Sequence, residues 1–400
     1  MKLSSGAKKA FLLGSLCSIS YLAVYVAKGA LSAASPGMTQ SGAFTTEQIG
    51  TLSSIYFIVY AIGQLINGFI GDRIKAKYMI SFGLIFASAG FLLLPQLSHL
   101  PNYATIAYAS AGFFMAMIYG PMTKVVAENT EPIYATRCSV GYTMASFLGS
   151  PAAGVLAAAL PWPWVFRSTG GILLIMGAVA FVCFSLMEHR GIIKYGQYDR
   201  PKGSKGGVKV LLKRQIVKFT LIAILTGVVR TTVVFWMPTY ISQHLGFVPE
   251  KATLIFSVAS LAFSFSAINA IVIYEKLNRN MDLAILLGFI TSAVFFLLVF
   301  FIKQPILNVV FLSLAILGNN LAASLMWSRY CPSLYDTGMV STATGFLDAC
   351  SYLAAATSSK LFSNAAGTLG WGVLILVWCG LMFCGVIVAL PWRKKVVSEV

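Results

Sequence analysis

Twelve apolar stretches, each longer than 20 residues, recur along the chain and constrain what it can fold into. They lie at roughly residues 10–35, 46–70, 78–98, 103–126, 137–160, 164–187, 216–242, 252–274, 281–301, 304–328, 338–363 and 369–391. A bilayer core of about 30 Å takes about 20 apolar residues as one helix, so each stretch is long enough to cross a membrane. Hydrophobic residues make up 58% of the chain and charged residues 10%, against about 25% charged in soluble proteins. The sequence therefore predicts an all-α membrane protein with 12 transmembrane helices and no separate soluble catalytic domain.

One long polar stretch, at roughly residues 188–218, separates the sixth apolar stretch from the seventh. We expect an N-terminal six-helix bundle over residues 1–188, a cytoplasmic linker over 189–215 and a C-terminal six-helix bundle over 216–400. Charged features recur about 203 residues later, since Lys28 corresponds to Arg230 and Lys124 to Arg329. This spacing predicts two pseudo-symmetric halves related by an axis along the membrane normal, with a substrate cavity between them.

The formal net charge is +17, from 29 Lys and Arg against 12 Asp and Glu. Most basic residues fall in loops on one predicted side of the membrane, together with both ends of the chain, which predicts cytoplasmic N- and C-termini. Orientation in the bilayer explains the charge, so no nucleic-acid partner is predicted. Short outer loops without an Asn-x-Ser/Thr motif favour the bacterial inner membrane. The seven cysteines lack metal-binding or disulfide spacing, so we expect no metal and no cofactor.

A charged motif follows the second apolar stretch, where residues 68–77 read GlyPheIleGlyAspArgIleLysAlaLys. It resembles the GxxxDRxxx[RK] signature of major-facilitator proteins, with Lys75 where the signature usually has glycine. The acidic group can take the positive dipole of a helix end, and the basic groups can pair with carboxylates across the bundle. The alternative is a loop that only orients the helices. We expect a cytoplasmic gate that includes Asp72, Arg73, Lys77, Lys124 and Arg137.

Lys28 and Arg230 are cations inside apolar stretches, one in the first helix of each predicted half. A Lys or Arg in hydrocarbon costs at least about 2.5–3.5 kcal/mol, so it must face a cavity or a partner. Tyr21, Tyr25 and Lys28 stand at i, i+4 and i+7, which places two phenols and an ammonium on one helix face. Pro238 is expected to kink the helix that carries Arg230. Two converging cations indicate an anionic ligand, and the alternatives are snorkelling to the lipid surface or an internal salt bridge.

Four short patches carry a resemblance to a family: Tyr25-Val-Ala-Lys28, Arg230 through TrpMetProThrTyr (236–240), TyrGlyProMetThrLys (119–124) and GlyPheLeuAspAlaCysSerTyrLeu (345–353). They resemble motifs on helices 1, 7, 4 and 11 of the organophosphate:phosphate antiporter branch of the major-facilitator superfamily. That branch includes glycerol-phosphate and hexose-phosphate transporters. The resemblance implies that Lys28 and Arg230 occupy the places of the family's two substrate-clamping arginines, with Tyr352 in the cavity.

This chain departs from that branch at two places. Lys28 replaces an arginine, which removes the two-pronged geometry of a guanidinium, although a lysine still binds an anion. No histidine lies within the fifth predicted helix, where the bacterial glycerol-phosphate member has one. A phosphate ester, a carboxylate, a sulfonate or a larger head group therefore all stay open as substrates.

Asp348 is the one acidic residue well inside a predicted span, and Tyr352 follows it by one helical turn. It can serve as a counter-ion for the two cations, as a protonatable group that couples transport to H⁺, or as a packing carboxylate. Other polar groups inside spans are candidates for the cavity lining, although each alone is as readily a helix-packing hydrogen bond. The binding candidates among them are Tyr56, Tyr60, Tyr119 and Asn320.

These features predict a secondary transporter that moves a small organic anion, a phosphate ester or a carboxylate, by alternating access and anion exchange. The expected partners are the substrate, H⁺ or a counter-anion, and the lipid bilayer, with the protein acting as a monomer. No P-loop, HExxH or GxSxG motif occurs, so the sequence does not predict an enzyme. The alternatives are an H⁺-coupled transporter of an amphipathic drug or lipid-like molecule, and a non-transporting anion sensor.

Overall fold

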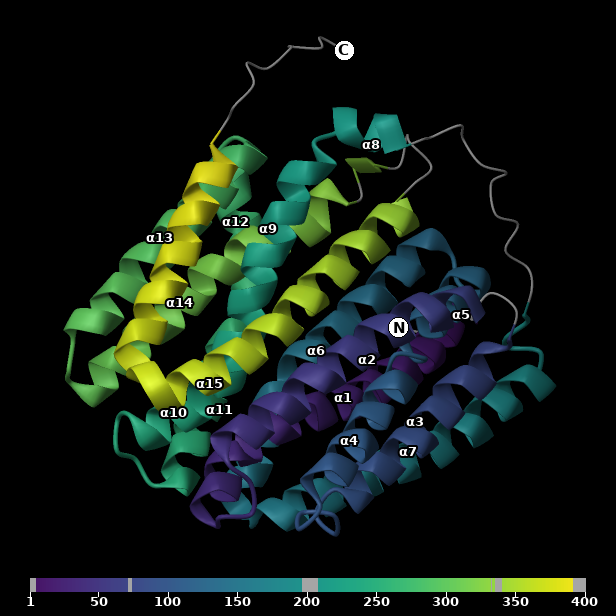
Figure 1. Ribbon diagram of the computed structural model, residues 1–400. Helices are drawn as coiled ribbons and strands as arrows, with labels where there is room; N and C mark the ends of the chain where they lie inside the picture. Colours follow the sequence, from purple (N-terminus) through teal and green to yellow (C-terminus); the bar gives the residue numbers. More distant parts are fainter. Residues whose placement is uncertain (1–4, 71–73, 196–207, 332, 335–339, 391–400) are drawn as a thin grey trace. The chain divides into compact units, whose positions relative to one another are not determined.

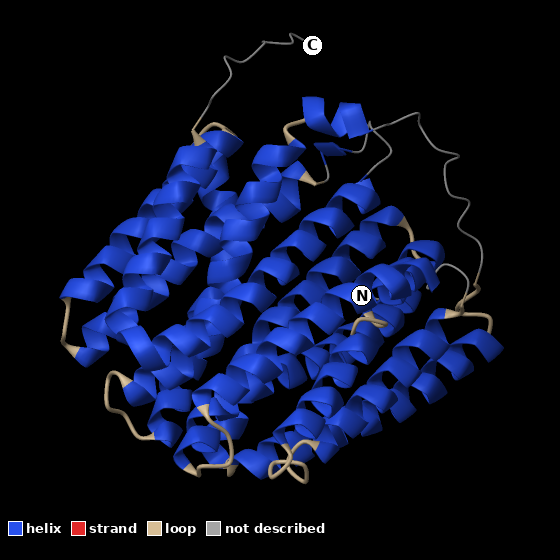
Figure 2. Ribbon diagram, viewed as in Figure 1, coloured by secondary structure: helices blue, strands red, loops and turns tan. Residues whose placement is uncertain are grey.

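A computed structural model describes residues 5–70, 74–195, 208–331, 333–334 and 340–390. Within these ranges the chain is nearly all helical and forms no strand (Figure 2). Up to the central polar stretch the helices are α1 (Ser5–Gln40), α2 (Thr46–Ile70), α3 (Ala76–Leu93), α4 (Pro101–Met115), α5 (Tyr119–Asn129), α6 (Pro132–Ala159) and α7 (Trp162–His189).

After the central polar stretch, short turns of π-helix interrupt the α-helices. One π-helical turn covers Val229–Val233 and another Met326–Tyr330. The α-helices are α8 (Val208–Lys213), α9 (Ile216–Val228), α10 (Val234–Gln243), α11 (Pro249–Ser264), α12 (Ser266–Lys276), α13 (Met281–Phe301), α14 (Pro305–Leu325) and α15 (Val340–Ala389).

The all-α fold predicted from the apolar stretches is confirmed, because every predicted stretch falls on a helix or on two consecutive helices. Eight of the described helical segments are long and apolar enough to cross a membrane, so the protein is a multi-pass membrane protein. The predicted total of 12 spans is not confirmed. The last two predicted stretches both fall on α15, and the non-helical backbone at Gly370, where φ is 76°, divides α15 into two helical parts.

The chain packs as two compact units that draw on separate parts of the sequence. The first comprises Met1–Gly203, Val234–Ser264 and Ala355–Thr368, and the second comprises Ser204–Val233, Phe265–Ala354 and Leu369–Val400. α10, α11 and part of α15 thus pack with the N-terminal helices. The two six-helix bundles and the linker over 189–215 stay a prediction.

Small side chains let the helices of the first unit approach closely. α1 lies along α6, α3 along α7 and α2 along α4 (Figure 1). Ala33 and Ala153 are fully buried where α1 meets α6, with Val26 beside them. Lipid tails are as apolar as such side chains, so close van der Waals packing rather than the hydrophobic effect holds these helices together. This packing fixes the position of α1, which carries Lys28.

Candidate functional site

Lys28 lies on α1 with its ammonium over the faces of two tyrosine rings. Its Nζ is 3.9 Å from the ring centre of Tyr60 on α2 and 5.0 Å from that of Tyr25 on α1. The negative face of an aromatic ring attracts a cation, and this attraction is worth about 2 kcal/mol when the pair is desolvated. Gln64 donates a hydrogen bond of 2.7 Å from Nε2 to the hydroxyl of Tyr60, which holds that ring in place. The Lys28 side chain is only partly buried.

Further tyrosines surround this pair and form the tyrosine cluster: Tyr21, Tyr25, Tyr56, Tyr60, Tyr119 and Tyr142. Tyr21 is buried at its centre, with its ring 4.9 Å from that of Tyr25, 5.5 Å from that of Tyr119 and 6.2 Å from that of Tyr142. Tyr56 stacks on Tyr60 with 6.1 Å between ring centres. The first unit therefore brings Lys28 together with five tyrosines that the sequence predicted as binding residues.

Tyr142, on α6, belongs to the cluster although sequence reasoning did not select it. It is 5% exposed, and its ring also meets Tyr119 at 6.2 Å. The available signal was a tyrosine within the fifth apolar stretch, but only the packing of α6 on α1 places it here. Phenol hydroxyls both donate and accept hydrogen bonds, so the cluster combines a positive charge with donors that suit an anion carrying hydroxyl groups.

The remaining predicted binding residues belong to the second unit. Arg230 lies on the π-helical turn Val229–Val233, just before the α10 segment that holds Pro238. A proline has no amide hydrogen to bond the carbonyl four residues back, here Val234, and π-turns often occur at functional sites. Asp348 and Tyr352 lie one turn apart on α15 with partly buried side chains. Their convergence with Lys28 on one site stays a prediction.

Two consecutive asparagines, one buried and one partly buried, lie on α14 in the second unit. Asn319 is fully buried and donates a hydrogen bond of 3.2 Å from Nδ2 to the carbonyl of Thr226, one turn before Arg230. Its Oδ1 and the Oδ1 of the predicted binding residue Asn320 have no hydrogen-bond partner in the described part of the chain. Such acceptors favour a ligand or a water that donates hydrogen bonds.

The predicted gate residues are partly described. Asp72 and Arg73 lie outside the described residues. Lys77, at the start of α3, forms an ion pair with Glu188 at the end of α7, and Lys75 pairs with the same carboxylate at 2.6 Å. These ion pairs join two helices of the first unit. The sequence analysis expected pairs of this kind, between the basic residues of the motif and carboxylates across the bundle.

The other two predicted gate cations make local contacts. Lys124 lies 3.9 Å from the carboxylate of Glu128, one turn away on α5. The guanidinium of Arg137 lies 5.7 Å from the ring centre of Tyr134 on α6. Just past α7, burial raises the pKa of the Tyr195 hydroxyl, which keeps that phenol protonated beside Lys75. The gate role of these residues stays a prediction.

Hydroxyl side chains bond α1 to α10 within the first unit, toward the C-terminal end of α1. Ser32 donates a hydrogen bond of 2.5 Å to the carbonyl of Phe235, and the hydroxyls of Ser35 and Thr239 are 2.6 Å apart. Both pairs connect the first helix of the chain to a helix that follows the central polar stretch. No charged group takes part in these two bonds.

A second seam joins α2 to the 355–368 part of α15. Ser54 donates 2.7 Å to the carbonyl of Ala356, and the hydroxyl of Ser359 donates 3.0 Å to that of Ser53. A third bond in this seam comes from Lys360. We call the α1–α10 and α2–α15 bonds together the hydroxyl seam.

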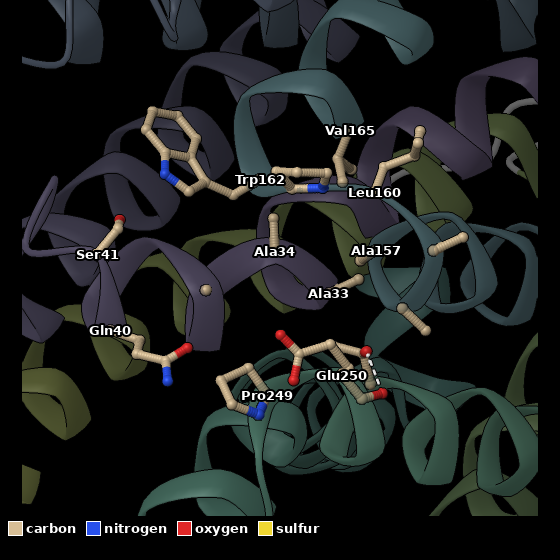
Figure 3. Close-up of a pocket in the computed structure, with 15 residues that line it drawn as sticks. Ala33, Ala34, Gln40, Ser41, Ala157, Leu160, Trp162, Val165, Pro249 and Glu250 are labelled. Atoms are coloured by element: carbon tan, nitrogen blue, oxygen red, sulfur yellow. Dashed lines mark hydrogen bonds between the residues drawn. The ribbon is translucent and has the colours of Figure 1, made fainter.

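A hollow of about 500 Å³ opens beside the hydroxyl seam (Figure 3). Alanines of α1 and α6 form part of its wall, together with the Trp162 side chain and with Pro249 and Glu250 at the start of α11. Sequence reasoning missed this hollow, because its wall comes from segments far apart in the sequence that carry no motif. None of the predicted binding residues lines it.

Residues 17–359 match the family model of the Major Facilitator Superfamily. The chain therefore belongs to the Major Facilitator Superfamily, and its class is that of membrane transporters. The crystal structure of a D-xylose-proton symporter superposes with a TM-score of 0.75 at 12% identity, over 96% of this chain and 98% of that one. The fold and family are those of transporters rather than of a catalytic family.

Two curated relatives are similar in sequence. The membrane sensor protein UhpC of Salmonella typhimurium is 24% identical over 252 residues, which cover 57% of this chain and 56% of the relative. The glycerol-3-phosphate transporter of Bacillus subtilis is 22% identical over 257 residues, 58% of each chain. The chain thus matches little more than half the length of each relative. The resemblance to the organophosphate:phosphate antiporter branch is confirmed by these relatives.

Proposed function

We propose that this protein is a secondary transporter that carries a small organic anion, a phosphate ester or a carboxylate, by alternating access. The observation that supports it is the Lys28 ammonium over the rings of Tyr25 and Tyr60, inside a helical bundle of a transporter family. A cation within a membrane-spanning bundle is costly, and an anionic substrate offsets that cost. In this proposal Arg230, on the matching helix of the second half, holds two oxygens of the same anion.

Exchange of anions follows from the charges. With Lys28, Arg230 and Asp348 facing one cavity, the empty site carries one net positive charge, which disfavours closure without a bound anion. A bound anion offsets the repulsion between the two cations and lowers the barrier to closure. Each anion that leaves is then replaced by another before the protein reorients, and Asp348 acts as the counter-ion of the empty site.

The test is uptake into proteoliposomes loaded with inorganic phosphate, using labelled glycerol 3-phosphate, glucose 6-phosphate and malate as probes. We expect the wild-type protein to exchange at least one probe and Lys28→Met to lose the exchange about tenfold or more, because a hydrogen bond to a charged group is worth about 1.5–3 kcal/mol. The matched control is Lys303→Met, which removes a lysine from the exposed turn between α13 and α14. Wild-type counterflow in the Lys28→Met protein would exclude the proposed site.

A non-transporting sensor is the second candidate, and one observation favours it: a similar relative is named a membrane sensor protein. In that case the same pocket binds the anion, and the bound state is passed to a partner rather than used for transport. Saturable binding of a probe to the purified protein without any exchange in proteoliposomes would establish the sensor and exclude the transporter.

We also propose the placement in the membrane that the basic residues predict, with cytoplasmic N- and C-termini in a cell membrane. Lys75 and Lys77 then lie at the cytoplasmic end of α3, and the hydroxyl seam lies at the outer end of the first unit. The two six-helix bundles, the monomeric state and a counter-anion as the coupling ion belong to the same proposal.

A further inference from the structure

Lys360 is the charged residue of the hydroxyl seam. Its Nζ donates a hydrogen bond of 2.9 Å to the hydroxyl of Thr51 on α2, and that hydroxyl in turn donates 3.0 Å to the carbonyl of Glu47. The Lys360 side chain is half-buried. Within the part of the chain that the structure describes, no carboxylate lies within ion-pair distance of this ammonium. Its polar partner there is a neutral hydroxyl.

The rest of the α2–α15 contact needs no charge. Serine hydroxyls make the neighbouring bonds, and Gly50 packs so closely on Ser363 that a methyl group at Gly50 would collide with the Ser363 side chain. A neutral hydrogen-bond donor in the place of the ammonium would bond Thr51 without the desolvation cost that a half-buried charge carries. The positive charge therefore has no use in the closed seam itself.

Lys360 bonds α2 nearer to the beginning of that helix than Lys28 does, and this beginning is the outer end in the proposed orientation. Thr51 precedes Tyr60 on α2 by nine residues, which is about 13 Å along the helix axis at 1.5 Å per residue. An anion that enters from that end therefore reaches the depth of Lys360 before the depth of Lys28. A positive group at an entrance attracts an anion and raises its local concentration.

We propose that Lys360 is an outer anion-binding residue: Thr51 holds its ammonium while the seam is closed, and when the seam opens the ammonium is released to bind the anionic group of the incoming substrate. The ligand is the phosphate or carboxylate group of the transported molecule. The inference rests on the proposed transport function. It adds a second anion-binding site, which is reached from one side of the membrane only.

The experiment compares right-side-out with inverted membrane vesicles, using inorganic phosphate and glycerol 3-phosphate as probes. Lys360→Met should raise KM about tenfold in right-side-out vesicles, the loss expected for one charged contact, and leave KM unchanged in inverted vesicles. kcat should stay within about twofold, and Lys360→Arg should keep the wild-type KM. Thr51→Val removes the partner but keeps the charge, so it should not raise KM.

The dependence of KM on salt provides a second readout. Raising ionic strength from about 0.05 to 0.3 M shortens the screening length, so it should raise the wild-type KM in right-side-out vesicles but not that of Lys360→Met. The inference is overturned if Lys360→Met leaves KM unchanged on both sides, if Thr51→Val reproduces its effect, or if the wild-type KM is insensitive to salt. If the wild-type protein moves neither probe in either vesicle, the transport function itself fails, and the outer anion-binding site fails with it.

Discussion

At the scale of single residues, Tyr60 makes one contact with its ring face and another with its hydroxyl, and substitutions can test the two separately. The ring face attracts the ammonium, whereas the hydroxyl accepts a hydrogen bond from Gln64. Tyr60→Phe keeps the face and should change KM for the transported anion less than about threefold. Tyr60→Leu removes a cation–π contact worth about 0.5–2 kcal/mol, so it should raise KM about two- to thirtyfold.

The two variants control for each other, because both delete the hydroxyl and both leave the Gln64 amide without this acceptor. KM measured by initial rates in proteoliposomes distinguishes them. Equal KM values for Tyr60→Phe and Tyr60→Leu would mean that the ring face does not hold Lys28 in its working position, and the loss would then belong to the hydrogen bond with Gln64.

At the scale of helices, Gly149 on α6 sets how closely α6 approaches the Tyr25 part of α1. A Cβ at Gly149 would lie 2.6 Å from the backbone carbonyl carbon of Tyr25, which is too close for any rotamer change to relieve. Gly149→Ala should therefore force the helices apart and destabilise the protein by about 1–3 kcal/mol, the usual cost of overpacking. Thermal unfolding of the purified protein measures this loss.

Gly171 on α7 is the matched control, because a Cβ there would meet no atom within 4 Å. Gly171→Ala should be neutral or stabilise the protein by about 0.5–1 kcal/mol, since alanine favours helix more than glycine does. A Gly149→Ala protein as stable as the wild type would show that α1 and α6 can separate without loss. The tyrosine cluster would then not depend on their close approach.

The helices were largely predictable from the sequence, and their interruptions were not. Apolar length alone located α1, α2 and α13, because a spanning helix must bury every backbone polar group within itself. The π-helical turn Val229–Val233 has the same apolar composition as the helix around it, so hydropathy carries no signal for it. Pro238 predicts a kink in this helix, but a kink indicates neither that a π-turn forms nor where it lies.

The candidate site was predictable only where its residues share one helix. The i, i+4, i+7 spacing placed Tyr21, Tyr25 and Lys28 on a common face, and their ring and ammonium contacts agree with it. The approach of Tyr60 and Tyr142 depends on how α2 and α6 pack against α1, which is set by contacts distant in sequence. Ion pairs such as Lys77 with Glu188 likewise need a folded bundle before a partner can be named.

At the scale of the whole molecule, the compact units cut across the predicted sequence halves, since residues 234–264 and 355–368 pack with the N-terminal helices. The hydroxyl seam makes part of that connection, and apart from the Lys360 ammonium on Thr51 its bonds are between neutral groups. Neutral hydrogen bonds are worth about 0.5–1.5 kcal/mol each, so such a seam closes one end of the unit yet can open on the timescale of a transport cycle. The proposed alternating access requires that this seam opens.

A disulfide across the seam tests that requirement directly. The hydroxyl oxygens of Ser35 and Thr239 are 2.6 Å apart, which places cysteines at these positions within reach of a disulfide bond. The double variant Ser35→Cys, Thr239→Cys should exchange anions when reduced, lose at least about tenfold of that activity on oxidation, and regain it with dithiothreitol, because a covalent link holds the seam shut. Each single variant, treated with the same oxidant, controls for the seven native cysteines, which are all free. Undiminished exchange by the cross-linked protein would mean that substrate moves without parting α1 from α10, and the seam would then be a fixed part of the structure rather than a gate.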